Sequence, residues 1–211
     1  MRKKILLILP LLLFAITQQL QAVTCNWGYC NSVVNDQFGS VNKGKGAIYI
    51  PAEISKMYEG KQLSYVRVGL AAKAKTVKVF VTKDLNGEYI TTRTQRDQLS
   101  GFNEIKFAEP WTIDGEGFYI GYEFESDDYA LGSSTMYNEN GCWADLGDGW
   151  KNYAVEDHAL ALSIQAKISG DNLPKDYWLF CSNDILAEAG KPFNINFSIR
   201  NMGTAIGRRF Q

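Results

Sequence analysis

Hydrophobic side chains recur at every second position through most of this 211-residue chain, and this period of two constrains the fold most. Successive side chains of a strand point to opposite faces of a sheet, so such a run buries one face and exposes the other. The clearest runs are 76–82, 117–124, 160–168 and 193–199, and weaker strands are predicted at 47–50, 63–70, 104–107, 129–137 and 177–181. Turns rich in Gly, Asn and Asp separate the runs. The pattern predicts an all-β protein, an antiparallel sandwich of the jelly-roll type.

One helix and one tight hairpin are predicted within this pattern. Residues 51–60 begin with Pro51 and end with Gly60, and apolar side chains at 54, 57 and 58 fall on one face of a short helix. We expect it to cover one end of the sandwich. The Asn86–Gly87 pair predicts a hairpin turn between the 76–82 strand and residues 89–90.

The first 22 residues have the features of a secretory signal peptide. Three basic residues follow Met1, an apolar run occupies 5–16, and the small residue Ala22 precedes the expected cut. The apolar run is far shorter than the roughly 20 residues that span a bilayer. We therefore expect an exported protein without a membrane span, either secreted or located in the periplasm or at the cell surface.

The charge balance excludes several functions. Removing residues 1–22 leaves 189 of the 211 residues, and the loss of Arg2, Lys3 and Lys4 changes 22 basic residues to 19, against 23 acidic ones. A net charge of −4 does not favour nucleic-acid binding, which usually needs a basic patch. His158 is the only histidine, so no site with several histidine ligands can form.

Four cysteines are present, at Cys25, Cys30, Cys142 and Cys181. An exported chain meets an oxidising compartment, so we expect disulfides, and four cysteines allow three pairings. Cys25 and Cys30 can close a small loop with each other. Alternatively, one of them joins the mature N-terminus to Cys142 or Cys181. The spacings match no zinc-ribbon pattern, so no structural metal is expected.

A hydrolase is the alternative from another functional class. Cys142 as nucleophile and His158 as base, oriented by Asp145 or Asp157, would form a cysteine peptidase or related hydrolase. No Gly-x-Ser-x-Gly turn and no papain-like surroundings of the cysteine support it. We expect the chain not to be an enzyme.

Aromatic residues beside an acidic loop are the better functional lead. Trp143 and Trp150 flank a Gly-rich loop that contains Asp145 and Asp148. A sugar ring stacks on indole faces while carboxylates bind its hydroxyl groups. These four residues are therefore the predicted ligand-binding set, with no cofactor expected. Calcium is the alternative, because Asp145, Asp148 and the Asp127–Asp128 pair supply oxygen ligands on turns, although the EF-hand spacing is absent.

Several segments resemble a family of bacterial modules. Residues 46–53 (GAIYIPAE), 63–70, 76–82, 117–122 (GFYIGY) and 159–168 resemble the strands of jelly-roll, adhesin-type modules attached to secreted peptidases and surface proteins. These are similar to the cleaved-adhesin domains of gingipains. The resemblance covers about residues 40–170, and it implies a jelly roll that binds rather than catalyses.

The tail has a second resemblance. Residues 189–205 (AGKPFNINFSIRNMGTA) resemble the first two strands of an Ig-like, cell-adhesion-related bacterial domain. The expected organisation is a signal peptide at 1–22, a jelly-roll sandwich with its lead-in at 23–172, and a partial Ig-like segment at 173–211. Because such domains continue for several more strands, a truncated structural spacer is a further alternative.

The expected function is therefore that of a non-catalytic exported binding or adhesion module, acting alone or as the accessory part of a larger protein. Its expected ligand is a carbohydrate or a host protein.

Overall fold

The computed structural model describes residues 23–154 and 160–174, together with the backbone of two strands at 177–181 and 197–201. The predicted signal peptide, His158 and the start of the predicted 193–199 strand lie outside the described residues.

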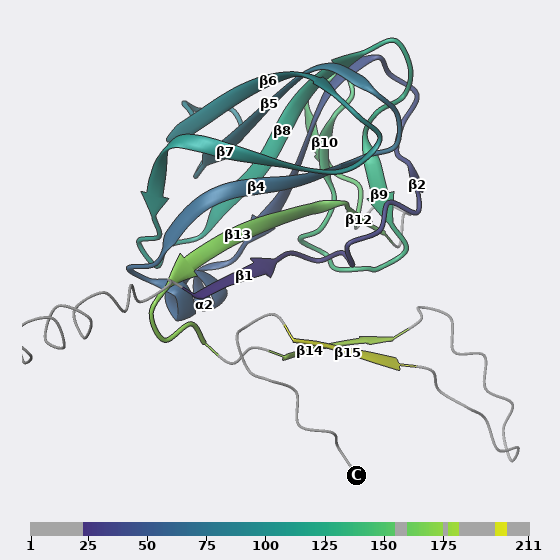
Figure 1. The fold of residues 1–211 in the computed structure, drawn as a ribbon. Coiled ribbons are helices and arrows are strands. Elements are labelled where there is room, and N and C mark those ends of the chain that lie inside the picture. The colour runs from purple at the N-terminus through teal and green to yellow at the C-terminus, as the bar shows by residue number, and fades with distance from the viewer. Residues whose placement is uncertain (1–22, 155–159, 175–176, 182–196, 202–211) are drawn as a thin grey trace, which may run out of the picture.

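Two antiparallel sheets form the body of the molecule (Figure 1). The four-stranded sheet contains, in spatial order, β1 (Val23–Trp27), β13 (Ile164–Gly170), β4 (Gln62–Leu70) and β7 (Gly101–Thr112). The six-stranded sheet contains β11 (Trp150–Asn152), β10 (Trp143–Asp145), β3 (Lys43–Ile50), β8 (Phe118–Ser126), β5 (Ala74–Thr82) and β6 (Thr91–Gln98).

The strand pairs are nested, and this makes the sandwich a jelly roll. The β5–β6 hairpin is innermost in the sequence, β4 pairs with β7 around it, β3 pairs with β8 around both, and β1 pairs with β13 outside them all. The pairs belong alternately to the two sheets, so the chain repeatedly crosses between them. The predicted all-β antiparallel sandwich is confirmed.

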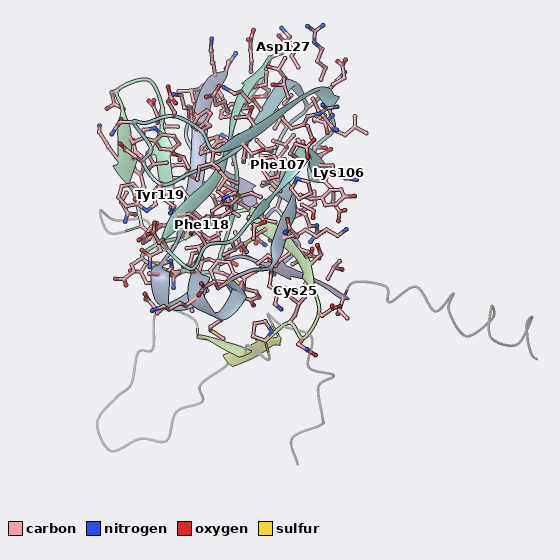
Figure 2. All side chains as sticks on the ribbon, turned by 90° about the vertical axis from the view of Figure 1, so that its left-hand side faces the viewer. Cys25, Lys106, Phe107, Phe118, Tyr119 and Asp127 are labelled. Carbon is pink, nitrogen blue, oxygen red and sulfur yellow. The ribbon has the colours of Figure 1, made fainter. Side chains whose placement is uncertain are left out.

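The core lies between the two sheets, where the alternating residues point inward. Val77, Val79 and Val81 of β5 have no exposed surface, and Ile120 and Tyr122 of β8 are equally buried. Burying such side chains stabilises the fold by about 1.5–3 kcal/mol each. Figure 2 shows the alternation directly: Phe118 and Phe107 lie within the body, while their neighbours Tyr119 and Lys106 lie on opposite outer sides.

The predicted helix is present but short. α2 (Ala52–Ser55) passes into a 3₁₀ turn, η1 (Lys56–Tyr58), and Gly60 ends the segment with a φ of 76°. Such a left-handed conformation after a helix is where glycine is favoured. The tighter 3₁₀ turn changes which of the predicted apolar side chains face the core: Tyr58 is buried, whereas Met57 is 40% exposed.

The remaining strands form two small sheets. β12 (Ala161–Leu162), β9 (Gly132–Ser134) and β2 (Asp36–Gln37) form one, and β14 (Tyr177–Cys181) and β15 (Phe197–Asn201) form the other. The predicted 160–168 strand is therefore divided at Ser163 between two sheets, and the predicted 129–137 strand is reduced to the three residues of β9.

Of the disulfides that the sequence allows, those among Cys25, Cys30 and Cys142 are not formed. All three residues are buried, and no disulfide joins the cysteine side chains that the structure describes. Cys25 pairs with Ile168 across the sheet, whereas the Cys30 thiol donates to the carbonyl of Ile164 at 3.5 Å. The side chain of Cys181 lies outside the described residues.

Candidate functional site

The β10–β11 hairpin extends the six-stranded sheet and places two predicted site residues on its outer face. β10 pairs with β3 so that Trp143 lies opposite Ala47 and Asp145 opposite Lys45. β11 pairs with β10 so that Trp150 lies opposite Asp145. Because these positions belong to the outward set of each strand, both indoles face away from the core between the sheets. The structure thus brings Trp143 and Trp150 to one surface.

These indoles are part of a larger group of partly or fully buried rings, which we call the outer aromatic cluster: Tyr49, Phe80, Tyr89, Tyr119, Trp143 and Trp150. Phe80 stacks on Tyr89 with centroids 4.3 Å apart, and Trp150 meets the Phe80 ring edge-on at 6.2 Å. Tyr119 contacts Trp143 edge-on at 5.5 Å and Tyr49 at 4.7 Å. Such ring pairs stabilise by about 0.5–1.5 kcal/mol beyond the area that they bury.

Small residues form the floor beneath the rings. Ala47 and Gly121 lie opposite each other on β3 and β8, and Phe80 lies opposite Gly121 on β5. The absence of a side chain at Gly121 leaves room for the Phe80 ring. Ala47, Phe80 and Leu85 are buried there as a hydrophobic cluster separate from the main core. The indole nitrogen of Trp143 is also buried, and it has no hydrogen-bond partner among the described residues.

A row of alternating charges crosses the sheet beside the cluster: Asp145, Lys45, Glu123 and Lys78, on β10, β3, β8 and β5. Glu123 is the best satisfied of them, because it accepts a hydrogen bond from the Tyr89 hydroxyl at 2.7 Å and lies 3.6 Å from the ammonium of Lys78. Partial burial, and then the hydrogen bond to Glu123, raise the pKa of Tyr89 above its usual value. Lys78 also lies 4.7 Å from the centre of the Tyr89 ring.

The two predicted aspartates have different structural roles. Asp145 closes the turn of the hairpin, because its Oδ1 accepts the backbone N–H groups of Gly147 and Gly149 at 3.0 and 3.1 Å. Asp148 forms an ion pair with Lys151, and that hydrogen bond holds the pKa of the carboxyl below its usual range. Oδ1 of Asp145 and the carboxylate of Asp148 are therefore engaged by the hairpin itself.

A pocket of about 270 Å³ lies where β3 begins, beside this turn. Its lining comes from three strands and the turn: Lys43, Gly44, Lys45, Glu123, Phe124, Asp145 and Gly147. Charged side chains of the row and an apolar wall thus meet at one end of the aromatic cluster. This combination of an apolar surface with a few polar groups is typical of small-ligand sites.

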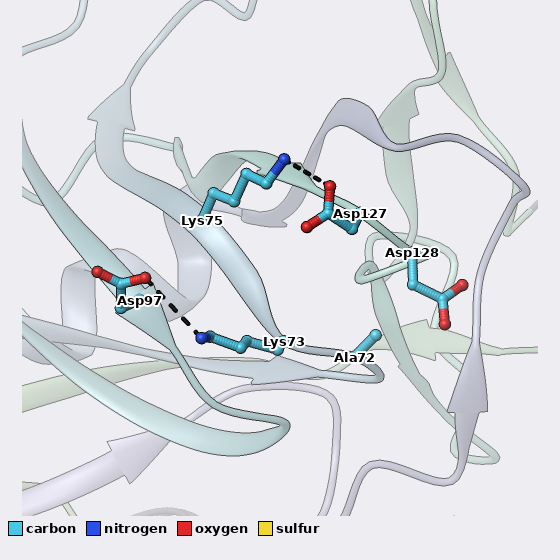
Figure 3. Close-up of a pocket in the computed structure, with 6 residues that line it drawn as sticks. All are labelled: Ala72, Lys73, Lys75, Asp97, Asp127 and Asp128. Carbon is cyan, nitrogen blue, oxygen red and sulfur yellow. Dashed lines mark ion pairs between the residues drawn. The ribbon is translucent and has the colours of Figure 1, made fainter.

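Asp127 and Asp128, the other proposed calcium ligands, line a different pocket of about 410 Å³ (Figure 3). Lysines pair with two of its three aspartates: Lys75 lies 2.5 Å from Asp127, and Lys73 lies 3.9 Å from Asp97. Across the residues that the structure describes, no three His, Cys, Asp or Glu side chains come together as a metal site.

The alternative catalytic pair cannot be assembled from the described residues, because His158 lies outside them. Cys142 is fully buried, and burial raises the pKa of its thiol to about 12. The thiolate is the nucleophilic form of cysteine, so a thiol in this environment is a poor nucleophile near neutral pH.

Sequence reasoning missed the residues that the other strands contribute: Tyr49, Phe80, Tyr89, Tyr119, Lys45 and Glu123. The signal was present in the strands themselves. Phe80 and Tyr119 occupy outward positions, where a strand facing only water would carry polar side chains.

Comparison with known proteins adds no relative to this picture, because no protein-family model, no curated protein and no solved structure matches the chain. Within the part of the chain that the structure describes, no helix has the length and apolar character needed to cross a membrane.

Proposed function

We propose that this chain is a non-catalytic, exported binding module that takes a carbohydrate on the outer face of its six-stranded sheet. The observation that carries the proposal is the outer aromatic cluster. Five of its six rings are only partly buried, on a sheet face that points away from the core. Sugar rings bind such surfaces through their C–H faces, while neighbouring charged groups bind their hydroxyls.

Two features beside the cluster support a ligand rather than packing alone. The charged row and the 270 Å³ pocket supply hydrogen-bonding groups next to the rings. The indole nitrogen of Trp143 is buried without a hydrogen-bond partner among the described residues, and a group left in this state costs about 1–3 kcal/mol. Such groups call for an explanation, and a functional role is one of them. The resemblance to adhesin-type modules agrees with this proposal. The buried Cys142 does not favour the hydrolase alternative.

Saccharide binding by purified full-length protein tests the proposal. A glycan array identifies bound saccharides, and calorimetry then compares wild type with Trp143→Ala and Trp150→Ala. We expect each variant to bind roughly tenfold more weakly or worse, as the loss of a stacking ring implies. Truncation to alanine also opens a gap in the cluster, so two further variants, Trp143→Phe and Trp150→Phe, keep an aromatic ring in place. These should bind the saccharide with an affinity between those of the alanine variants and wild type.

Tyr65→Ala is the matched control. Tyr65 is an aromatic residue on the outer face of the four-stranded sheet, between the ammonium groups of Lys106 and Lys167 at 5.8 and 4.9 Å from its ring centre. It should bind like wild type. An array without any bound saccharide, or tryptophan variants that bind as tightly as wild type, would overturn the proposal. Binding to a host protein alone would replace the carbohydrate with a protein ligand.

A further inference from the structure

The acidic and basic side chains around the 270 Å³ pocket differ in how closely they are paired with hydrogen-bond partners and counter-ions. Asp145 uses Oδ1 to accept two backbone N–H groups of its own turn, and Glu123 is held by Tyr89 and Lys78. Both acidic groups that line the pocket therefore have partners. Among the residues that the structure describes, the lysines of the same pocket have no equivalent partners.

Lys45 has only a distant counter-ion. Its ammonium lies 3.9 Å from Oδ2 of Asp145, beyond hydrogen-bond range, and the lysine side chain remains 37% exposed. The same ammonium lies 5.9 Å from the centre of the Trp150 ring. Lys43, two residues earlier on β3, points to the same face and has no carboxylate within 4.0 Å among the described residues.

From this arrangement we infer that the pocket binds the carboxylate of an acidic saccharide, with Lys45 as its main partner, Lys43 as a second cation, and the sugar ring against Trp150. This inference rests on the proposed function and specifies the ligand class of the same site. A carboxylate would reach the two lysines without displacing the hydrogen bonds of Asp145 or Glu123. A neutral sugar would leave both ammonium groups without a better partner.

Carboxylated sugars come from two sources, uronic-acid polymers and terminal sialic acids, and the test separates them. The full-length protein is titrated with tetragalacturonate and its carboxyl-reduced counterpart, and with sialyllactose and lactose. We expect one acidic probe to bind at least tenfold more tightly than its neutral counterpart, which is the magnitude of a hydrogen bond between charged groups. Raising the salt concentration should weaken this binding, because exposed charges are screened.

The variant Lys45→Gln should lose this preference, and Lys45→Arg should restore most of it. Lys106→Gln is the matched control, since Lys106 lies 5.8 Å from the Tyr65 ring centre on the opposite sheet, close to the distance between Lys45 and Trp150. It should bind like wild type.

The failure of this inference can be told apart from failure of the proposed function. Equal affinity for acidic and neutral probes, combined with dependence on Trp150, would overturn the role of Lys45 and leave saccharide binding in place. Acidic binding that Lys45→Gln does not change would also overturn it. Absence of binding to all four probes would overturn the acidic-saccharide assignment, whatever the glycan array shows.

Discussion

The ring of Phe80 occupies the space above Gly121, so that a Cβ at position 121 would lie 2.6 Å from Cζ of Phe80. The same Cβ would lie 2.3 Å from the carbonyl oxygen of Gly46, which belongs to the neighbouring strand. The aromatic cluster on the outer face therefore depends on a residue without a side chain in the middle of the sheet.

Gly121→Ala should destabilise the protein, because neither the ring nor the backbone oxygen can be accommodated without a shift. Overpacking of this kind costs about 1–3 kcal/mol. Denaturant unfolding of wild type and variant measures this loss of stability. Gly87→Ala is the control, because a Cβ there would meet only side-chain atoms of Asp84 at 3.2–3.4 Å. Equal stability of Gly121→Ala and wild type would show that Phe80 does not lie over Gly121.

Asp145 and Asp148 should respond differently to truncation. Asp145→Ala removes the acceptor of two backbone N–H groups, and we expect the free energy of unfolding to fall by about 1–2 kcal/mol. Asp148→Ala removes an exposed ion pair and should leave the free energy of unfolding nearly unchanged. Thermal unfolding of the two variants compares them. A larger loss for Asp148→Ala would contradict the assignment of Asp145 as the residue that closes the turn.

Alkaline pH should destabilise the fold. Burial raises the pKa of Tyr29, Tyr89 and Tyr122 above the ordinary value of 10.0. The unfolded chain therefore releases these protons first, and the stability that is fully present below pH 10 decreases as the pH rises further. Denaturant unfolding at pH 8 to 11 measures the free energy of unfolding across this range. The variant Tyr122→Phe should lose less of this free energy per pH unit than wild type. A stability that stays constant over this range would contradict the burial of these hydroxyls.

The buried thiols should resist alkylation. Cys25, Cys30 and Cys142 have 7% exposed surface or less, and burial raises the pKa of Cys142. We expect iodoacetamide to modify these three cysteines slowly in the native protein and rapidly in denaturant, as followed by peptide mass spectrometry. Peptide mapping without reductant should find no crosslink between Cys25 and Cys30. A crosslink there would contradict the structure, in which no disulfide joins these two side chains.

The fold was largely predictable from the sequence because alternation directly records which face of a strand is buried. Val77, Val79 and Val81 were expected on one face, and all three are fully buried. β6 escaped prediction because it is an edge strand with the polar sequence TTRTQRDQ, so hydrogen bonding to β5 stabilises it rather than an apolar face. The three-residue strands β10 and β11 were missed because a periodic pattern needs a longer segment.

The candidate site was only partly predictable. Trp143 and Trp150 lie close together in the sequence, and one hairpin places both on one face. Their partners Tyr49, Phe80 and Tyr119 come from three strands whose neighbours in the sheet are set by jelly-roll nesting. A local pattern contains no information on that nesting. The turn role of Asp145 was missed for a different reason, because a carboxylate in a Gly-rich loop is compatible with ligand binding and with loop closure alike.

The most direct test of the binding face is a ¹⁵N spectrum of the indole N–H groups while a saccharide that binds in the array or in the titrations is added. We expect the signals of Trp143 and Trp150 to shift as this saccharide binds. The signals of Trp27, which is fully buried, and of Trp111, which packs against Phe118 from β7, should stay in place. If the signals of Trp143 and Trp150 remained unchanged at a saturating concentration of that saccharide, the outer face of the six-stranded sheet would not be the binding surface.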